Sequence, residues 1–146
     1  MVRSLYPLES CGYDAKNIRL SMIIRLQSPV YLAGGLKSGW QDRMIAAFPR
    51  EKFFNPASHG LTNEREYTGW DLDHVSKART LFGYMEKDNP SGIGLALEIG
   101  FACAQNKFII FVDETSREDY RKFGMARSAA HVIFQSLDEA MLLLLP

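Results

Sequence analysis

The sequence predicts a flavodoxin-like doubly wound α/β fold, with about five strands in a mainly parallel sheet and helices on both faces. Short apolar runs of β-type alternate along the chain with segments whose apolar residues recur at helical spacing. Such alternation favours right-handed βαβ crossovers and a parallel sheet. The chain has 146 residues, of which 47% are hydrophobic, so it is long enough to build one domain around a substantial core.

Short apolar runs, most of them bounded by turn residues, predict the strands. The run KFIIFV is the clearest, because it is apolar almost throughout and so suits a strand that is buried on both faces. The run PVYLA ends in a glycine pair, and FF ends at Asn55-Pro56. The predicted strands are Pro29–Ala33, Phe53–Phe54, Thr80–Met85, Lys107–Val112 and His131–Phe134.

The segments between these runs predict the helices. Asn106 is suited to end the third helix, and Ser136 begins a pattern that resembles a capping box. Thr62 or Asn63 could cap a helix or turn that starts directly after it. The polar segment Asp113–Gly124 is expected to be partly helical. The predicted helices are Gly39–Phe48, Trp70–Ala78, Gly94–Asn106 and Ser136–Leu145.

Residues 1–27 show no clear period and carry several turn residues. They are predicted to form an N-terminal extension of uncertain order, and the domain proper is predicted at residues 28–146. Alternatively, Ile23 and Ile24 could extend the first strand or pack on the fold.

Composition excludes several classes of protein and predicts a cytoplasmic one. Lys+Arg and Asp+Glu both number 17, and this balance gives no basic surface for gripping a nucleic acid polymer. No apolar run approaches the ~20 residues of a membrane span, and the N-terminus lacks the apolar core of a signal peptide. The two cysteines, Cys11 and Cys103, are expected to be reduced thiols.

Ligands of doubly wound folds bind beyond the carboxyl ends of the strands, and this rule selects three loops. The first, Gly34–Gly39, lacks the spacing of a Walker loop and of a GxGxxG fingerprint. It is therefore either a plain turn or a place where backbone N–H groups, with Tyr31 nearby, meet a polar ligand. The second loop is Lys87–Gly92, with the sequence KDNPSG, and the third begins at Asp113.

Glu98 is the most informative residue, because it is a carboxylate inside the otherwise apolar segment GLALEIGFACA. The helix that carries it starts from the second loop, so Glu98 lies in the first or second turn, near the ligand end of the sheet. No face of this helix is plainly polar before Gln105, and we expect it to be buried most of the way round. A buried carboxylate is costly unless it is paired or hydrogen-bonded, and burial raises its pKa. Glu98 therefore either reaches solvent or an arginine, or it serves a ligand.

Asp71 and Asp73 lie two residues apart on a predicted helix, so their side chains point in different directions. One could face the site and the other solvent, although a solvated or capping role is the commoner one for such residues. His59, His74 and His131 show no metal-ligand spacing with one another or with the cysteines. The sequence therefore predicts no metal and no other cofactor.

Several segments together resemble the nucleoside 2-deoxyribosyltransferase family, which includes related N-glycoside hydrolases of deoxynucleoside 5′-monophosphates. The segments are VYLAGG, WDLDHVSKA, DNPSGIGLALEIGFACAQNKFIIFVDE and FGMARSAAHVIF. The similarity runs from about Pro29 to the C-terminus, and its most specific part is SGIGLALEIGFA followed by a strand. The sequence departs from the family pattern at Arg79, where many members have an aspartate.

The resemblance implies roles for individual residues. Glu98, in LEIG, matches the family's catalytic glutamate, which is the nucleophile at C1′ of deoxyribose. Asp71, in WDLDH, matches an acidic residue that orients the substrate or protonates the leaving base, and Asp73 fits that role less well. Met125, in FGMARS, matches a segment that family members lend to a neighbouring subunit's site, which implies a homo-oligomer. The residues expected to bind substrate are Tyr31, Gly34, Gly35, Asp88, Asn89, Ser91, Gly92 and Met125.

Ser91 bears on the choice of substrate. In the transferases an acidic residue near this point grips the sugar hydroxyl, whereas the monophosphate hydrolases have a serine at the phosphate. Asp88 or Asn89 could take the sugar-gripping role in this chain, and Lys37 and Ser38 are possible phosphate contacts.

The resemblance thus implies an enzyme that cleaves the N-glycosidic bond of 2′-deoxynucleosides and transfers the deoxyribosyl group to another base. Its partners would be a nucleoside or nucleotide and a free nucleobase, without a nucleic acid polymer or a membrane. A deoxynucleoside 5′-monophosphate hydrolase that uses the same glutamate is the alternative. A non-catalytic nucleotide-binding domain of this fold is a third possibility.

Overall fold

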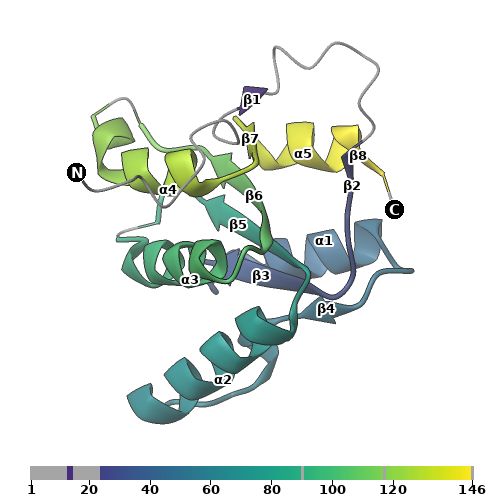
Figure 1. The fold of residues 1–146 in the computed structure, drawn as a ribbon, viewed down its shortest axis with the longest axis vertical. Coiled ribbons are helices and arrows are strands. Elements are labelled where there is room, and N and C mark those ends of the chain that lie inside the picture. Colours follow the sequence, from purple (N-terminus) through teal and green to yellow (C-terminus); the bar gives the residue numbers. More distant parts are fainter. Residues whose placement is uncertain (1–12, 15–23, 90, 117, 146) are drawn as a thin grey trace, which may run out of the picture.

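The computed structural model describes residues 13–14, 24–89, 91–116 and 118–145 (Figure 1). The extension predicted over residues 1–27 lies mostly outside these ranges, as does Cys11. No helix in the described ranges is long and apolar enough to cross a membrane.

The main sheet has the strand order β1-β7-β6-β5-β3-β4, and every neighbouring pair is parallel. When the short edge strand β1 is left out, β3 is the first of five strands along the chain, and it lies between the second, β4, and the third, β5. This is the flavodoxin-like order. The predicted fold class is therefore confirmed. A separate parallel pair joins β2 to β8. The strands are β1 (Tyr13–Asp14), β2 (Ile24–Arg25), β3 (Val30–Gly34), β4 (Phe53–Phe54), β5 (Thr80–Met85), β6 (Phe108–Asp113), β7 (Val132–Phe134) and β8 (Leu144–Leu145).

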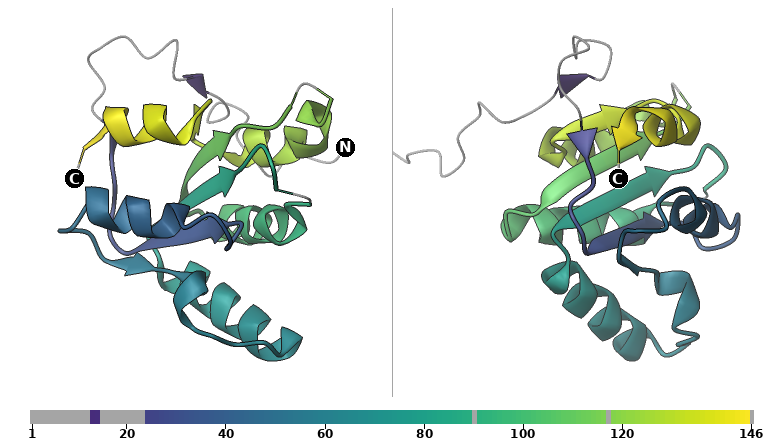
Figure 2. Two further views of the ribbon diagram at one scale, coloured as in Figure 1. Left: turned by 180° about the vertical axis from the view of Figure 1, so that it is seen from behind. Right: turned by 90° about the vertical axis from the view of Figure 1, so that its right-hand side faces the viewer.

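Helices cover both faces of the sheet (Figures 1 and 2). Helices α1 and α5 pack on one face, whereas α2, α3 and α4 pack on the other. Two short 3-10 helices, η3 and η4, precede α2 and α4. The helices are α1 (Trp40–Ala47), η3 (Pro56–Ser58), α2 (Glu64–Lys77), α3 (Ile93–Ala104), η4 (Tyr120–Phe123), α4 (Gly124–Ala129) and α5 (Leu137–Leu143).

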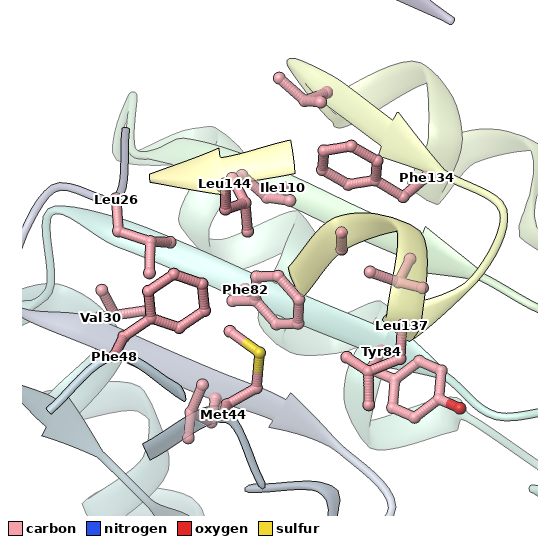
Figure 3. Close-up of a cluster of buried hydrophobic side chains, with 14 of the residues drawn as sticks. Leu26, Val30, Met44, Phe48, Phe82, Tyr84, Ile110, Phe134, Leu137 and Leu144 are labelled. Carbon is pink, nitrogen blue, oxygen red and sulfur yellow. The ribbon is translucent and has the colours of Figure 1, made fainter. Parts of the chain in front are cut away.

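Successive residues of each strand point to opposite faces of the sheet and pack into two hydrophobic layers, as a sheet buried on both faces requires. In β3, Leu32 packs into the layer under α1 and α5, and its neighbour Tyr31 packs into the layer under α2 and α3. Figure 3 shows the first layer, where Met44 and Phe48 lie close to Phe82 of β5. Tyr31 is fully buried, so its position is fixed by the packing around it.

The chain just before Pro29 also joins the core. Ile24 and Leu26 are buried in the layer that contains Leu144 of β8. The division of the chain between residues 27 and 28 stays a prediction, because most of the first 27 residues lie outside the described ranges.

Helix α2 begins at Glu64, one and a half turns before the predicted start at Trp70. The side chain of Asn63 caps it by accepting hydrogen bonds from the N–H groups of Arg65 and Glu66. Asn63 is one of the two caps suggested by the sequence. The residues that follow it are polar and exposed, so no apolar period decided between a helix and a turn.

Helix α3 is not buried most of the way round, and that expectation was wrong. Leu95 and Ile99 face the sheet and are buried, but Ile93 is 76% exposed and Leu97 is 59% exposed. One apolar surface of α3 is therefore covered by the sheet, and a second apolar surface is exposed.

Candidate active site

Glu98 and Tyr31 form the centre of a polar cluster between the sheet and its helices. Tyr31 is the second residue of β3, and Glu98 lies in the second turn of α3. The Tyr31 hydroxyl donates a hydrogen bond of 2.7 Å to Oε1 of Glu98. The buried side chains of Leu95 and Ile99 lie on the same helix, to either side of Glu98 along the chain. The carboxylate is therefore partly buried and is held by one strong donor.

Asp71 brings a second carboxylate to this cluster from α2. Its Oδ1 atom is buried and has no hydrogen-bond partner among the described residues. The Tyr31 hydroxyl interacts with both Glu98 and Asp71. Asp73, in contrast, is half exposed and pairs with Lys77 on the helix surface. Of the two acidic residues considered from the sequence, only Asp71 faces the cluster.

The cluster shifts the acidity of its members. Burial raises the pKa of Glu98 to about 8; the hydrogen bond from Tyr31 opposes this rise, and the nearby charge of Asp71 adds to it. Burial also raises the pKa of Asp71, although the Tyr31 hydroxyl and His59 offset part of that rise. The pKa of Tyr31 lies far above its ordinary value, because burial and both carboxylates oppose the phenolate. Glu98 and Asp71 thus form a pair of neighbouring carboxyl groups whose pKa values are both raised, as is common at sites of acid–base chemistry.

His59 packs against Asp71 from the loop that follows η3. Its Nδ1 accepts a 2.9 Å hydrogen bond from the N–H of Leu61, and its Nε2 lies 3.6 Å from Oδ1 of Asp71. The ring contacts Trp70 edge to face, with 4.8 Å between centroids. The His59 side chain is only 9% exposed, so this histidine is a fixed part of the cluster.

A cavity of about 460 Å³ lies at the carboxyl ends of β3 and β5. Close approach of the backbone at this point requires glycine at position 34, whereas the neighbour of Gly35 is the mobile end of a side chain. A Cβ on Gly34, whose φ is 150°, would lie 2.5 Å from the carbonyl oxygen of Tyr84, and one on Gly35 would lie 2.6 Å from Oε2 of Glu86. The lining residues are Gly35, Leu36, Lys37, Ser38, Glu86, Asp88 and Asn89.

The loop between β5 and α3 carries the remaining predicted residues. The Ser91 N–H donates to Oδ1 of Asn89 at 3.2 Å, so the Asn89 side chain helps to shape the loop. The side chains of Asp88 and Ser91 are exposed. Gly92 has a φ of 66°, and a Cβ there would lie 2.7 Å from Sδ of Met85. Gly92 therefore sets the path of the chain into α3.

Met125 does not pack into the cluster of its own chain, because its side chain on α4 is 90% exposed. The segment that carries it is nevertheless anchored. Arg127 of α4 forms an ion pair of 2.6 Å with Asp113 at the end of β6, and its guanidinium lies 3.3 Å from the ring centroid of Tyr120. The exposure of Met125 is thus a property of a fixed surface.

Two residues of the site were missed from the sequence. Glu86 follows directly after β5, but the loop predicted there begins one residue later, at Lys87. With the loop counted from Glu86, the rule on strand ends selects this residue as well. His59 gave no such signal, because it lies in a loop without a period and its partner Asp71 is distant in the chain. Among the described residues, no group of three or more His, Cys, Asp or Glu side chains could hold a metal ion.

Comparisons with known proteins find the fold again among solved structures. A 2-deoxyribosyltransferase from Bacillus psychrosaccharolyticus is 20% identical, with 77% of this chain and 89% of that chain covered and a TM-score of 0.58. A CMP N-glycosidase from Clostridium botulinum is 20% identical, with 81% and 95% covered and a TM-score of 0.53. A 2-deoxyribosyltransferase from Leishmania mexicana is 16% identical, with 77% and 93% covered and a TM-score of 0.57. No family model and no curated protein sequence matches the chain.

Proposed function

We propose that the chain is an enzyme of the nucleoside 2-deoxyribosyltransferase family. It cleaves the N-glycosidic bond of 2′-deoxynucleosides and transfers the deoxyribosyl group to another base. The observation that carries this proposal is the partly buried cluster, in which the hydroxyl of Tyr31 bonds to Glu98 and also interacts with Asp71. The fold shared with two deoxyribosyltransferases and an N-glycosidase supports it.

In this reaction Glu98 is the nucleophile. Its carboxylate attacks C1′ of the sugar, the C1′–N bond breaks through an oxocarbenium-like state, and the bonding electron pair leaves with the base. Asp71 donates a proton to the departing base. A second base then attacks C1′ and releases Glu98, while Asp71 takes up the proton that the incoming base loses. The reaction therefore proceeds with retention at C1′.

The raised pKa values suit these roles. Glu98 with a pKa of about 8 is a stronger nucleophile once ionised than an exposed glutamate would be. The Tyr31 hydroxyl favours the ionised form, because it donates to the carboxylate. Asp71, whose pKa is also raised, keeps its proton to a higher pH than an exposed aspartate would, which suits a residue that delivers a proton. One proton on the carboxyl pair, placed on Asp71, gives the reactive state.

The cavity beside Gly35 is the proposed site for the 5′ end of the sugar. Its lining contains none of Tyr31, Asp71 and Glu98, so the substrate would extend from the cavity to the cluster. The cavity places the carboxylates of Glu86 and Asp88 in the same lining as Lys37 and Ser38. Carboxylates accept hydrogen bonds from sugar hydroxyls but repel a phosphate, which favours a nucleoside over a nucleotide. The alternative, a deoxynucleoside 5′-monophosphate N-glycosidase, is favoured by Lys37 and Ser38, with Ser91 as a further phosphate contact.

A homo-oligomer with shared sites is part of the proposal. Ile93 and Leu97 of α3 and Met125 of the neighbouring α4 are apolar and exposed. These three residues, here called the α3/α4 apolar face, suit burial against a second copy of the chain. Met125 would then reach the site of the neighbouring protomer.

Base exchange tests the function. The protein is incubated with 2′-deoxynucleosides or their 5′-monophosphates, with and without free adenine, and the products are separated by chromatography. Formation of 2′-deoxyadenosine from another 2′-deoxynucleoside is the expected result, and Glu98→Ala should abolish it. Free base released from a monophosphate without any acceptor would instead indicate the hydrolase. Undiminished turnover in Glu98→Ala would reject the assigned nucleophile, and tight nucleotide binding without turnover would indicate a non-catalytic domain.

A further inference from the structure

We propose that His59 is a positioning residue for Asp71. The Nε2–H group of His59 holds Oδ1 of Asp71, so that the proton for the leaving base is carried and delivered by the other oxygen, Oδ2. This inference rests on the proposed function, because it refines how the acid of that reaction works.

The hydrogen-bond pattern fixes the tautomer of His59. Its Nδ1 accepts the N–H of Leu61 at 2.9 Å, so that nitrogen carries no hydrogen. A neutral imidazole with an accepting Nδ1 has its hydrogen on Nε2. This is the nitrogen that faces Asp71, at 3.6 Å from Oδ1. His59 therefore presents a donor to the carboxyl group.

Aromatic packing fixes the orientation of the His59 ring. Trp70 meets the ring edge to face, at an interplanar angle of 64°. Trp70 is itself stacked on His74, with 3.7 Å between centroids, and Nδ1 of His74 lies 2.7 Å from the carbonyl oxygen of Trp70. The neighbours of His59 are thus held by α2, which also carries Asp71. A rotation of the ring would break the bond to Leu61.

Asp71 needs the donor that His59 provides. Its Oδ1 is buried and has no hydrogen-bond partner in the described part of the chain. Leaving such an oxygen unsatisfied is costly. The distance of 3.6 Å is longer than a hydrogen bond, and catalytic contacts of this kind tighten when the substrate closes the site. His59 is the facing donor that can complete it.

The arrangement has a consequence for catalysis. With Oδ1 occupied, the carboxyl group of Asp71 cannot rotate freely, and Oδ2 is the oxygen that remains for the proton. A donor to the carboxylate also favours the ionised form, so Asp71 releases its proton more readily. Loss of His59 should therefore slow the departure of bases that need a proton and spare a base that leaves without one.

Two substitutions separate the functions of the two ring nitrogens. In His59→Asn the carboxamide reaches the position of Nδ1 but has no atom at Nε2. In His59→Gln the longer side chain brings an N–H group to the position of Nε2. Each variant is assayed with 2′-deoxyadenosine, whose base leaves with a proton, and with 7-methyl-2′-deoxyguanosine, whose base leaves without one.

We expect His59→Asn to lower kcat/KM for 2′-deoxyadenosine by about 10- to 100-fold, within the contribution of a general acid. The loss for 7-methyl-2′-deoxyguanosine should stay under about threefold, as in Asp71→Asn, and His59→Gln should recover part of the activity. The double variant with Asp71→Asn should lose no more than Asp71→Asn alone. Equal losses on both substrates, or fully additive losses in the double variant, would overturn the proposal.

His131→Asn is the matched control. Nδ1 of His131 also accepts a backbone N–H, that of Ile109 at 3.1 Å, but it does so next to β7 and not at the cluster. This variant should keep both activities even if its stability falls. A selective loss on 2′-deoxyadenosine in His131→Asn as well would contradict the assignment.

A spectroscopic measurement tests His59 independently of turnover. The 15N chemical shifts of its ring should show the Nε2–H tautomer, and the Nε2 signal should move in Asp71→Asn. An Nδ1–H tautomer, or an Nε2 signal unaffected by Asp71→Asn, would reject the role of His59 even if the enzyme is active. Absence of turnover on every substrate, with these shifts as expected, would reject the proposed function and keep the contact.

Discussion

At the scale of single residues, Glu98 shows how burial and one hydrogen bond compete. Burial favours the neutral acid, whereas the Tyr31 hydroxyl favours the carboxylate, and the balance leaves a pKa of about 8. With this pKa the carboxyl group of Glu98, the proposed nucleophile, is mostly protonated at neutral pH. The rate of the proposed reaction should therefore depend on pH, because Glu98 must lose its proton. It should also depend on the Tyr31 hydroxyl, because that group lowers the pKa of Glu98.

The first prediction concerns Tyr31→Phe. For the wild type, kcat/KM should rise with pH up to about 8, because Glu98 must be ionised to attack. Loss of the hydroxyl removes a charge-assisted hydrogen bond to the carboxylate. In Tyr31→Phe the midpoint of this increase in kcat/KM should therefore lie about one pH unit higher, and kcat/KM near neutral pH should fall about tenfold. A pH–rate profile of each protein measures both effects.

Tyr84→Phe is the control for this prediction. The Tyr84 hydroxyl bonds to Glu114 at 2.9 Å and lies in the other hydrophobic layer. Its loss should leave the pH profile unchanged. A profile that is the same in Tyr31→Phe and the wild type would show that the hydroxyl does not set the pKa of Glu98.

The second prediction concerns the stability of Glu98→Gln. The folded chain binds the Glu98 proton more tightly than the unfolded chain, because the pKa rises from 4.5 to about 8 on folding. The wild type should therefore lose stability as pH rises through this window, and glutamine, which does not titrate, should not. The difference in free energy of unfolding between the variant and the wild type should therefore change in favour of the variant by roughly 2–4 kcal/mol from about pH 4.5 to pH 8. Urea denaturation at both ends of the window measures this, and an equal difference at both would contradict it.

The residues of the site were predictable from the sequence to different degrees. Glu98 stands out because a charge in an apolar helix needs a partner, and the rule on strand ends gives its place. Spacing alone left Asp71 and Asp73 open, and the family resemblance favoured Asp71; the structure places Asp71 at the cluster and Asp73 on the helix surface. His59 could not be found, since its role depends on a contact across the fold.

At the scale of elements, glycine sets the path into α3. Gly92 adopts a φ of 66°, and a Cβ there would lie 2.7 Å from Met85 Sδ and 2.8 Å from Cζ of Phe123. Gly100, within the same helix, would place a Cβ in open space. The two glycines therefore offer opposite outcomes on substitution.

The third prediction compares Gly92→Ala with Gly100→Ala. Gly92→Ala should lower the free energy of unfolding by about 1–3 kcal/mol, because the added methyl meets its neighbours and the backbone is strained. Gly100→Ala should be neutral or stabilising by up to about 1 kcal/mol, because alanine is the better helix former. Denaturant unfolding of both variants measures the difference, and equal effects would contradict the account of the turn before α3.

Elements were predictable where apolar residues recur with a clear period. The strands β5 and β6 are buried runs, and the sequence places them to within a residue. The start of α2 was predictable in part: the sequence suggests a cap at Thr62 or Asn63, but the first turn is polar and leaves open whether a helix or a turn follows. For α3 the helix itself was predictable, but its burial was not. It carries apolar residues on all sides, so the sequence does not indicate which side of the helix is covered.

At the scale of the whole molecule, the alternation of strands and helices determines the order of the sheet. Right-handed crossovers leave few arrangements for five parallel strands, and the flavodoxin-like order is one of them. The carboxyl ends of β3 and β5 then meet at one edge, which is where the cavity forms. A single sequence cannot predict the surfaces that a second chain would cover, and the α3/α4 apolar face is proposed here as such a surface.

The fourth prediction tests that face. If Ile93, Leu97 and Met125 are buried between protomers, Leu97→Glu should place a charge in an apolar interface and shift the protein to monomers. Activity should fall with the oligomer, because Met125 is then withdrawn from the neighbouring site. Leu142→Glu is the matched control: Leu142 is 80% exposed, but it lies on α5, which packs on the other face of the sheet. Light scattering coupled to size-exclusion chromatography gives the mass of each variant. A wild type that is monomeric and fully active at assay concentration would reject both the interface and the sharing of sites.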